Sequence, residues 1–240
     1  MELNIIIPTF NEKNNIGVLL EKIFKLSNNI KIIIVDDSPN QDIKEIISQY
    51  NNVHYIHRDK KGGRGSAVIA GMNYALENFS CRYLIEMDAD LSHEPNEIIG
   101  NLNFFLNEDM DLLISSRYLK ESKIINWPPQ RKLLSFLANN LARGILKVPI
   151  SDYTNGFRIY SDNAANHIAF NCGKIGEGFI ILSEILVELY YNGFKVGETS
   201  SKFVNRVRGE SSVNFREIVN SFLGLIRIYN LKNQIKKDFN

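Results

Sequence analysis

The stretch Tyr83-Leu84-Ile85-Glu86-Met87-Asp88-Ala89-Asp90 joins an apolar run typical of a buried strand to two carboxylates with one residue between them. In extended backbone, residues i and i+2 point to the same side, so Asp88 and Asp90 are expected to converge. Two negative charges held this close repel each other unless a cation lies between them. Carboxylate oxygens suit Mg²⁺ or Mn²⁺. The pair is therefore a candidate metal site, and two solvated aspartates at a strand end are the alternative if the pair is taken alone.

Working outward from this stretch, short apolar runs alternate with helical patterns through the first half of the chain. The expected strands cover residues 4–7, 31–35, 53–57, 81–87 and 112–116, and the expected helices cover 14–26, 43–50 and 66–77. Asn14 or Asn15 is the expected cap of the first helix. Such alternation predicts an α/β fold with a mostly parallel sheet and helices on both faces. Ligands of these sheets bind beyond the carboxyl ends of the strands.

The second half is less regular. Helical patterns cover residues 131–147, 178–191 and 215–229, residues 152–158 form an expected loop, and residues 195–204 resemble a strand. A polar tail is expected from residue 232 to the end. We expect one domain over residues 1–212, with halves of about 1–118 and 119–212, followed by an amphipathic helix and tail over 213–240.

Composition narrows the class of protein. The 240 residues are 44% hydrophobic and 23% charged, with a formal net charge of +1. A nucleic-acid-binding domain is usually strongly basic, so no nucleic acid is expected as a partner. The two cysteines are far apart and suggest a reducing, cytoplasmic setting. Neither a signal peptide nor an apolar run of about 20 residues is evident, so we expect a protein that is soluble or lies on a membrane surface.

Polar clusters follow the expected strands. Pro8-Thr9-Phe10-Asn11-Glu12, where Pro8 is expected to end the strand, and Val35-Asp36-Asp37-Ser38 can hydrogen-bond a base or a ribose. Gly62-Gly63-Arg64-Gly65-Ser66-Ala67 allows close backbone approach at a helix start, where the helix dipole favours an anion. Taken singly, either aspartate is equally well explained as a helix cap, and segments like the other two are more often simple turns.

Cations and histidines complete the candidate residues. Arg117 follows the fifth expected strand, Arg131 begins a helix, and Arg206 and Arg208 share one loop. Arginine is suited to bidentate binding of phosphate, although a solvated surface charge is the simpler explanation of each one alone. The four histidines, at positions 54, 57, 93 and 167, have no ligand spacing and are interpreted as structural.

Taken together and in this order, the segments resemble family 2 glycosyltransferases of the GT-A fold, and among them the dolichyl- and polyprenyl-phosphate mannose synthases. The motifs that carry the resemblance include residues 5–12, 35–39, 63–69, 87–93, 116–118, 152–158 and 209–211. The resemblance implies a Rossmann-like three-layer fold with a mostly parallel mixed sheet. It covers nearly the whole chain and is closest to short forms without transmembrane helices.

The resemblance also implies roles for particular residues. Asp88, Asp90 and Ser92 would hold Mg²⁺ or Mn²⁺, Arg117, Arg131 and Ser135 would bind the acceptor phosphate, and Arg206 would bind the donor diphosphate. The chain departs from the family at two nearby positions: Ser212 replaces a lysine that would bind phosphate, and Arg208, which stands where tyrosine is usual, is the candidate to compensate for it. Asp152 is the candidate general base for a hydroxyl acceptor. The residues implied in nucleotide binding are Pro8, Thr9, Phe10, Glu12, Val35, Asp36, Asp37, Gly65, Ala67 and Ala89.

The implied reaction transfers a hexose, with mannose from GDP-mannose preferred, to a polyprenyl or dolichyl phosphate with inversion. Alternatives are a UDP-glucose or UDP-N-acetylhexosamine donor, a hydroxyl acceptor, and a non-catalytic subunit that binds a nucleotide sugar. Further expected partners are the cytosolic face of a membrane and a membrane-bound partner subunit. The helices at 131–147 and 215–229 are the candidates for contact with the membrane, and packing on the sheet is the alternative for each.

Overall fold

The carboxylate-bearing strand lies in the middle of one sheet. A computed structural model of the chain describes residues 3–27, 29–176, 178, 180–205 and 215–238. Within this part, seven strands form a sheet in the order β3-β2-β1-β4-β7-β5-β8, and only β7 runs antiparallel to its neighbours. They are β1 (Leu3–Thr9), β2 (Ile30–Asp36), β3 (Val53–His57), β4 (Tyr83–Glu86), β5 (Leu112–Ser116), β7 (Arg158–Ser161) and β8 (Val196–Ser200). The predicted α/β fold with a mostly parallel mixed sheet is confirmed.

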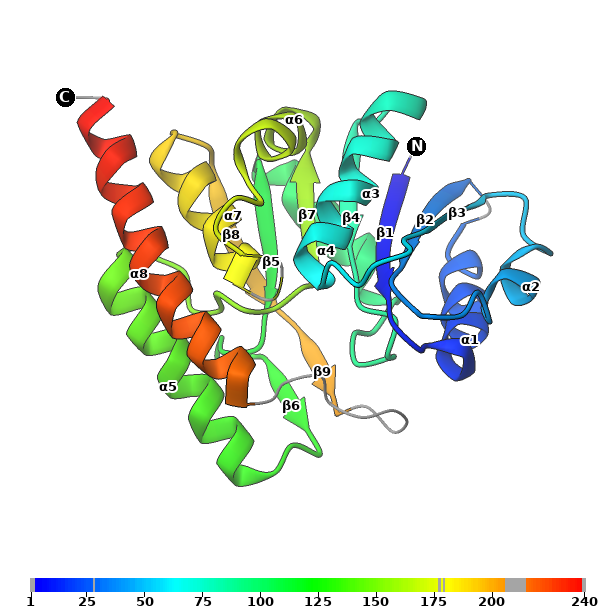
Figure 1. Ribbon diagram of the computed structural model, residues 1–240, viewed down its shortest axis with the longest axis horizontal. Coiled ribbons are helices and arrows are strands. Elements are labelled where there is room, and N and C mark those ends of the chain that lie inside the picture. Colours follow the sequence, from blue (N-terminus) through cyan, green and yellow to red (C-terminus); the bar gives the residue numbers. More distant parts are fainter. Residues whose placement is uncertain (1–2, 28, 177, 179, 206–214, 239–240) are drawn as a thin grey trace.

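Helices cover both faces of the sheet and make three layers, as predicted (Figure 1). One face carries α1 (Lys13–Phe24), α2 (Lys44–Ile47) and α4 (Glu97–Asn107). The other carries α3 (Arg64–Asn78), α6 (Asp162–Asn171) and α7 (Ile180–Tyr191), and α5 (Pro129–Leu146) and α8 (Phe215–Asp238) pack beside them. Each face has its own core cluster of buried apolar side chains. Along β1, Ile5 and Ile7 belong to the cluster on the α1, α2 and α4 face and Ile6 to the cluster on the α3, α6 and α7 face, because successive side chains of a strand alternate between faces.

Proline 8 does not end the first strand, contrary to the sequence-based expectation. β1 continues to Thr9, with Pro8 opposite Val35 on β2. The carbonyl of Thr9 accepts a hydrogen bond from Asp37 N on the β2 side, whereas that of Ile6 accepts one from Met87 N on the β4 side. Pro8 therefore faces the β4 side, where the pairing has already ended at Ile6, and its missing N–H breaks no ladder bond.

Strand β7 occupies part of the segment expected to be a loop. It inserts antiparallel between β4 and β5, with Arg158 opposite Glu86. Arg158 is fully buried, and its guanidinium donates to the carbonyl oxygens of Asn155, Leu182 and Tyr153 at 2.8–3.0 Å. An arginine inside a short strand carries no strand signal in the sequence, which explains why the strand was missed.

Other boundaries also differ from the expectations. The region expected as one strand at 195–204 is divided into β8 and β9 (Lys202–Val204), and β9 pairs with β6 (Lys123–Ile125) in a separate two-stranded sheet. Helices α4 and α6 had no sequence assignment. Helix α1 begins at Lys13 after Glu12, so neither Asn14 nor Asn15 caps it.

Helix α8 continues through most of the expected polar tail to Asp238. Leu225, Ile228 and Ile235 are buried at helical spacing, and Lys232 Nζ donates to the carbonyl oxygen of Ile145 at 2.9 Å. The packed face thus extends beyond Tyr229 even though the composition becomes polar. Across the described residues, every helix is either too short or too polar to span a bilayer.

Candidate active site

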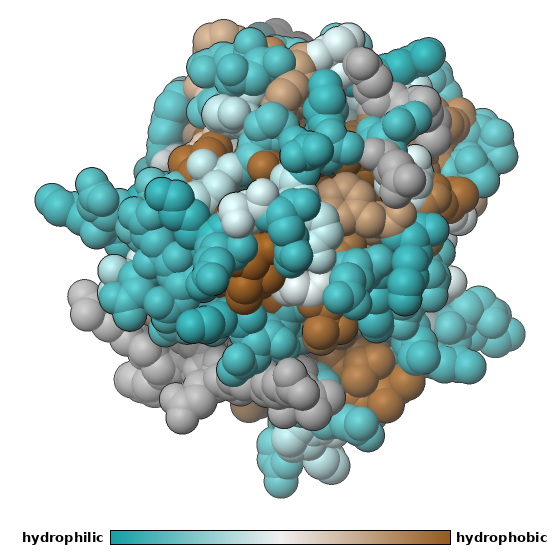
Figure 2. All heavy atoms as spheres, turned by 90° about the vertical axis from the view of Figure 1, so that its right-hand side faces the viewer, coloured by the Kyte–Doolittle hydropathy of each residue, from teal (hydrophilic) through white to brown (hydrophobic). Residues whose placement is uncertain are grey.

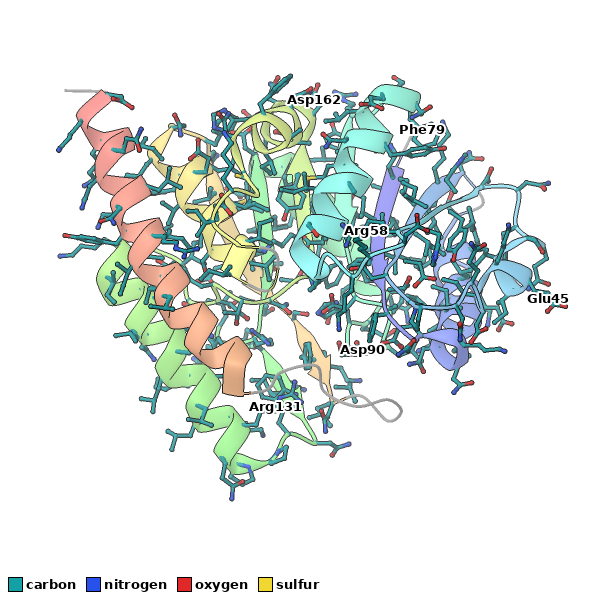
Figure 3. All side chains as sticks on the ribbon, in the orientation of Figure 1. Glu45, Arg58, Phe79, Asp90, Arg131 and Asp162 are labelled. Atoms are coloured by element: carbon teal, nitrogen blue, oxygen red, sulfur yellow. The ribbon has the colours of Figure 1, made fainter. Side chains whose placement is uncertain are left out.

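Most of the candidate residues gather where the parallel strands end. Figure 3 shows Asp90 and Arg131 in the lower part of the molecule, Asp90 below the carboxyl end of β1, and Phe79 and Asp162 at the opposite, upper end. This is the edge at which α/β sheets bind ligands.

Asp88 and Asp90 lie in a turn after β4, because the strand ends at Glu86; the expectation of extended backbone through Asp90 is therefore wrong. Asp88 N donates to His93 Nδ1 at 3.2 Å, and Ser92 N donates to Asp90 Oδ1 at 3.1 Å. His93 is buried, and its other ring nitrogen lies 3.0 Å from Asn155 Oδ1. His93 holds the turn and so has the structural role that the sequence suggested. The turn, not strand alternation, orients the two carboxylates.

Arg64, at the start of α3, is in direct contact with this turn. Its Nε and Nη2 each lie 2.7 Å from Asp88 Oδ1, and its Nη1 pairs with Glu86 Oε1. In the sequence, Arg64 is evident only as part of a glycine-rich segment, and no role was predicted for its side chain. Its position between three glycines at a helix start was the available signal.

Asp36 and Asp37 are both buried and hydrogen-bonded within the protein. Asp36 accepts hydrogen bonds from Thr9 Oγ1 and Tyr55 OH, at 3.0 and 2.9 Å. Asp37 pairs with Arg58 through both of its oxygens, and it also accepts from the backbone N–H groups of residues 62 and 63. Asp37 thus fastens the glycine-rich loop to the end of β2, whereas Asp36 ties β2 to β1 and β3. Their contact with a nucleoside remains a prediction.

The loop after β1 presents an exposed ring. Phe10 is 38% exposed, and Lys61 Nζ lies 3.6 Å from the centre of its ring. Glu12 Oε2 accepts a hydrogen bond from Asn15 Nδ2 at 2.6 Å. Phe10 and Lys61 form a cationic and aromatic surface at the end of β1, of the kind that can face a base or a phosphate.

Several predicted nucleotide-binding residues are buried and could reach a ligand only through their backbone. The side chains of Val35, Ala67 and Ala89 belong to the two core clusters. Gly65 lies in the first turn of α3 against α7, and an added Cβ would lie 2.1 Å from Ile181 Cγ2. Close packing between helices is therefore one reason for glycine at this position.

Arg117 and Asp152 form a buried ion pair. Arg117 Nε and Nη2 donate to the two oxygens of Asp152 at 2.8 and 2.7 Å, and Nη2 also donates to Thr154 Oγ1 at 2.7 Å. Burial disfavours both charges, but each partner's charge and hydrogen bonds outweigh it. The pKa of Asp152 is consequently lowered and that of Arg117 raised. The pair is ionised at neutral pH.

Arg131 and Ser135 lie on the first two turns of α5, close to this ion pair. Arg131 lies over the Trp127 ring, 4.2 Å from its centre, and donates to Asn205 Oδ1 at 2.9 Å. Ser135 Oγ accepts a hydrogen bond from Tyr118 OH at 2.6 Å. Trp127 also lies 5.4 Å from the Arg117 guanidinium, so one indole ring connects the two arginines. Arg206 and Arg208 lie outside the described residues.

The acidic turn fits a divalent cation that shares its coordination with a substrate. Among the described residues, no three histidine, cysteine, aspartate or glutamate side chains are arranged to hold a metal ion by themselves. Ser92 Oγ, however, is buried next to the turn without a hydrogen-bond partner in the described part of the chain. Two carboxylates and a hydroxyl, completed by phosphate oxygens and water, form a set that Mg²⁺ or Mn²⁺ accepts. This edge therefore combines a candidate cation site with the buried Arg117 and the partly buried Arg131, whose guanidinium groups suit phosphate.

The chain is similar in sequence to a known protein family and to curated relatives. A family model described as Glycosyl transferase family 2 matches residues 4–169. The chain is 32% identical over 221 residues to polyprenol monophosphomannose synthase of Mycolicibacterium smegmatis, covering 89% of this chain and 82% of that protein. It is 35% identical over 245 residues to dolichol-phosphate mannosyltransferase of Pyrococcus furiosus, covering 99% of this chain and 66% of that protein.

A solved structure shares the fold at much lower sequence identity. Glucosyl-3-phosphoglycerate synthase from Mycobacterium tuberculosis, in complex with Mn²⁺, UDP-glucose and phosphoglyceric acid, matches with a TM-score of 0.67 and 14% identity. The match covers 95% of this chain and 79% of that one. At this identity the likeness establishes the fold alone.

Proposed function

The chain belongs to glycosyl transferase family 2, and we propose that it transfers mannose from GDP-mannose to a polyprenyl or dolichyl phosphate with inversion at the anomeric carbon. The names of the two curated relatives, each more than 30% identical, support the sugar and the acceptor. The buried cations beside α5 support a phosphate acceptor on independent grounds.

The observation that carries the proposal is the Arg117–Asp152 pair. A hydroxyl acceptor needs a general base, but Asp152 has a lowered pKa and holds Arg117 with both oxygens, so it is a weak base. A lipid monophosphate has a second pKa near 6 and is largely ionised at neutral pH. It can attack without a base. We therefore assign Asp152 to positioning Arg117, and Arg117 to the acceptor phosphate.

Arg131 and Ser135 would complete the acceptor site. Both belong to one rigid helix, and Trp127 and Asn205 hold the Arg131 guanidinium from two sides. A planar guanidinium fixed in this way can bind phosphate oxygens and orient the nucleophile. The cations would also reduce the repulsion between the acceptor and donor phosphates.

On the donor side, we propose that Asp88, Asp90 and Ser92 hold Mg²⁺ or Mn²⁺. When bound, such an ion offsets the charge that develops on the leaving nucleoside diphosphate. Phe10 and Lys61 would face the nucleotide at the end of β1, with Arg206 and Arg208 on the diphosphate. The residues of the turn are held by His93 and Arg64, which keep the carboxylates in position before the substrate arrives.

We further propose that α5 lies on a membrane surface. Its side away from the protein exposes Leu133, Leu134, Phe136, Leu137 and Leu141, each 48–65% exposed. Exposed basic residues Lys132, Arg143 and Lys147 accompany this stripe. An apolar stripe with adjacent cations suits an anionic lipid surface. By contrast with α5, the side of the molecule on which α1 and α2 lie is mostly hydrophilic, with apolar side chains showing only in places (Figure 2).

The activity is tested by supplying GDP-mannose, Mn²⁺ and a short polyprenyl phosphate and identifying the product by mass. We expect a mannosyl phosphate lipid, and we expect Asp90→Asn to abolish it. Asp162→Asn, an exposed aspartate at the opposite end of the molecule, is the matched control (Figure 3). Wild-type turnover in Asp90→Asn would remove the metal role. If product forms only from UDP-glucose or UDP-N-acetylglucosamine, the proposed donor GDP-mannose is wrong and that UDP-sugar is the donor.

The acceptor site is tested by Arg131→Ala. We expect a higher KM for the lipid phosphate or a lower kcat, with GDP affinity unchanged. Equal loss of GDP affinity would move Arg131 to the donor side.

The membrane contact is tested by sedimentation with anionic vesicles. Replacing Leu134 and Leu137 with glutamate should release the protein from the vesicles while GDP still binds. Phe170→Glu, at an 80% exposed position on α6, should leave vesicle binding unchanged. Equal sedimentation of all three proteins would disprove the role of α5.

A further inference from the structure

We propose that Arg64 positions the metal-binding carboxylate Asp88 and limits how tightly the site holds a divalent cation before a nucleotide binds. The inference rests on the proposed function, in which Asp88 and Asp90 hold the cation. In this view the Arg64 guanidinium is a fixed positive charge within the metal site, and the metal and the nucleotide are therefore expected to bind cooperatively.

Arg64 is held in place from three directions. Two of its nitrogens bind Asp88 Oδ1, a third pairs with Glu86, and Nη2 donates to the carbonyl oxygen of Gly156 at 3.2 Å. The side chain is only 11% exposed. A guanidinium with three partners on two separate segments, residues 86–88 and Gly156, has one orientation, and so does the Asp88 oxygen that it binds.

Glu86 is the anchor of this arrangement. Its side chain is fully buried on β4, and its second oxygen accepts a hydrogen bond from Tyr160 OH at 2.6 Å. A buried carboxylate is costly without a cation, so Glu86 retains the Arg64 side chain beside it. Gly156 provides the space, since a Cβ there would lie 1.8 Å from Arg64 Nη2.

The position of Arg64 has a consequence for metal binding. A divalent cation that approaches Asp88 meets a fixed positive charge on the same carboxylate, which weakens its binding to the protein alone. A nucleoside diphosphate brings negative charge to the same place and offsets that repulsion. Each ligand should therefore raise the affinity for the other by the same factor.

The test measures Mn²⁺ binding directly, from the electron paramagnetic resonance signal of free Mn²⁺ with and without GDP. Arg64→Met removes the charge at similar length, and Arg64→Lys keeps it. Without GDP, we expect Arg64→Met to bind Mn²⁺ about tenfold more tightly than wild type, as when one nearby like charge is removed. The enhancement by GDP should shrink correspondingly. Arg64→Lys should stay near wild type, because it keeps the charge.

The outcomes separate the inference from the proposed function. If Asp90→Asn binds Mn²⁺ as well as wild type does, or if wild type binds none, the proposed metal site itself is wrong. If that binding exists but Arg64→Met binds Mn²⁺ no more tightly, the role of Arg64 is overturned while the metal site stands. If Arg64→Met does not fold, Glu86→Gln is the second test. It keeps a hydrogen-bond acceptor for Tyr160 but removes the negative charge of Glu86, so that Asp88 is the remaining anionic partner of Arg64 among these two residues. We expect it to weaken Mn²⁺ binding, and unchanged affinity would overturn the inference.

Discussion

At the scale of single residues, the site is built from ion pairs that are buried or partly buried. Asp37 with Arg58, Glu86 and Asp88 with Arg64, and Asp152 with Arg117 each join two loops at the carboxyl edge of the sheet. Removing one partner of such a pair leaves an uncompensated charge, which is more damaging than replacing both. These pairs give the loops a defined shape before any substrate is present.

Asp152→Asn tests this view. The pKa of Asp152 is lowered in the folded protein, so its stabilisation is complete above the ordinary value of 3.8 and is lost as the pH falls through the lowered pKa. We expect the variant to lose about 3 kcal/mol of unfolding free energy at neutral pH, and the difference from wild type to narrow below about pH 4. Urea unfolding over a pH series measures both. A difference independent of pH would contradict a stabilising charge.

At the scale of elements, the start of α3 depends on close approach to α7. Gly65 is where these helices meet, and a methyl group there would collide with Ile181 and with the carbonyl oxygen of Gly178. Since Arg64 is the preceding residue, the same contact determines where its side chain begins. Packing between two helices thus contributes to the geometry of the acidic turn.

We expect Gly65→Ala to lower the unfolding free energy by about 1–3 kcal/mol, because the helices must separate. Gly144→Ala is the matched control, since no atom lies within 4 Å of the added Cβ on exposed α5. It should be neutral or stabilising by up to about 1 kcal/mol, because alanine favours a helix more than glycine does. Urea unfolding of both variants measures this. Equal effects would rule out the packing explanation.

At the scale of the whole molecule, the two halves expected from the sequence share one sheet. Strand β7, from the second half, lies between β4 and β5 of the first, and β8 extends the sheet beyond β5. Helix α8 places Leu225 and Ile228 in the same core cluster as α3 and α7. We infer that the halves cannot unfold independently.

The sole tryptophan, Trp127, lies in the second half beside Arg117 and Arg131 and provides a local probe. We expect its fluorescence and the far-ultraviolet circular dichroism to report the same urea midpoint. A tryptophan transition well separated from the main one would mean that the second half folds as its own unit.

Much of the architecture was predictable from the sequence. The bounds of β3 and β5 match the expected strands, because each is a short segment rich in apolar or aromatic residues that is bounded by polar turns. The expectation failed where local composition and tertiary environment conflict. Arg158 lies in a buried strand because its guanidinium is satisfied by two carbonyl oxygens of the preceding loop and by that of Leu182 on α7. Helix α8 continues through polar residues because Lys232 donates to a carbonyl oxygen of α5.

The sequence by itself determined the alternation of strands and helices, the pair of carboxylates after β4 and the family, since periodicity and motif order are local properties of the chain. Only the tertiary structure decided that Asp152 belongs to Arg117, that Asp37 holds the glycine-rich loop and that Arg64 grips Asp88. The physical reason is that an ion pair forms between residues brought together by packing, and their separation of 21 to 35 positions along the chain carries no signal of it.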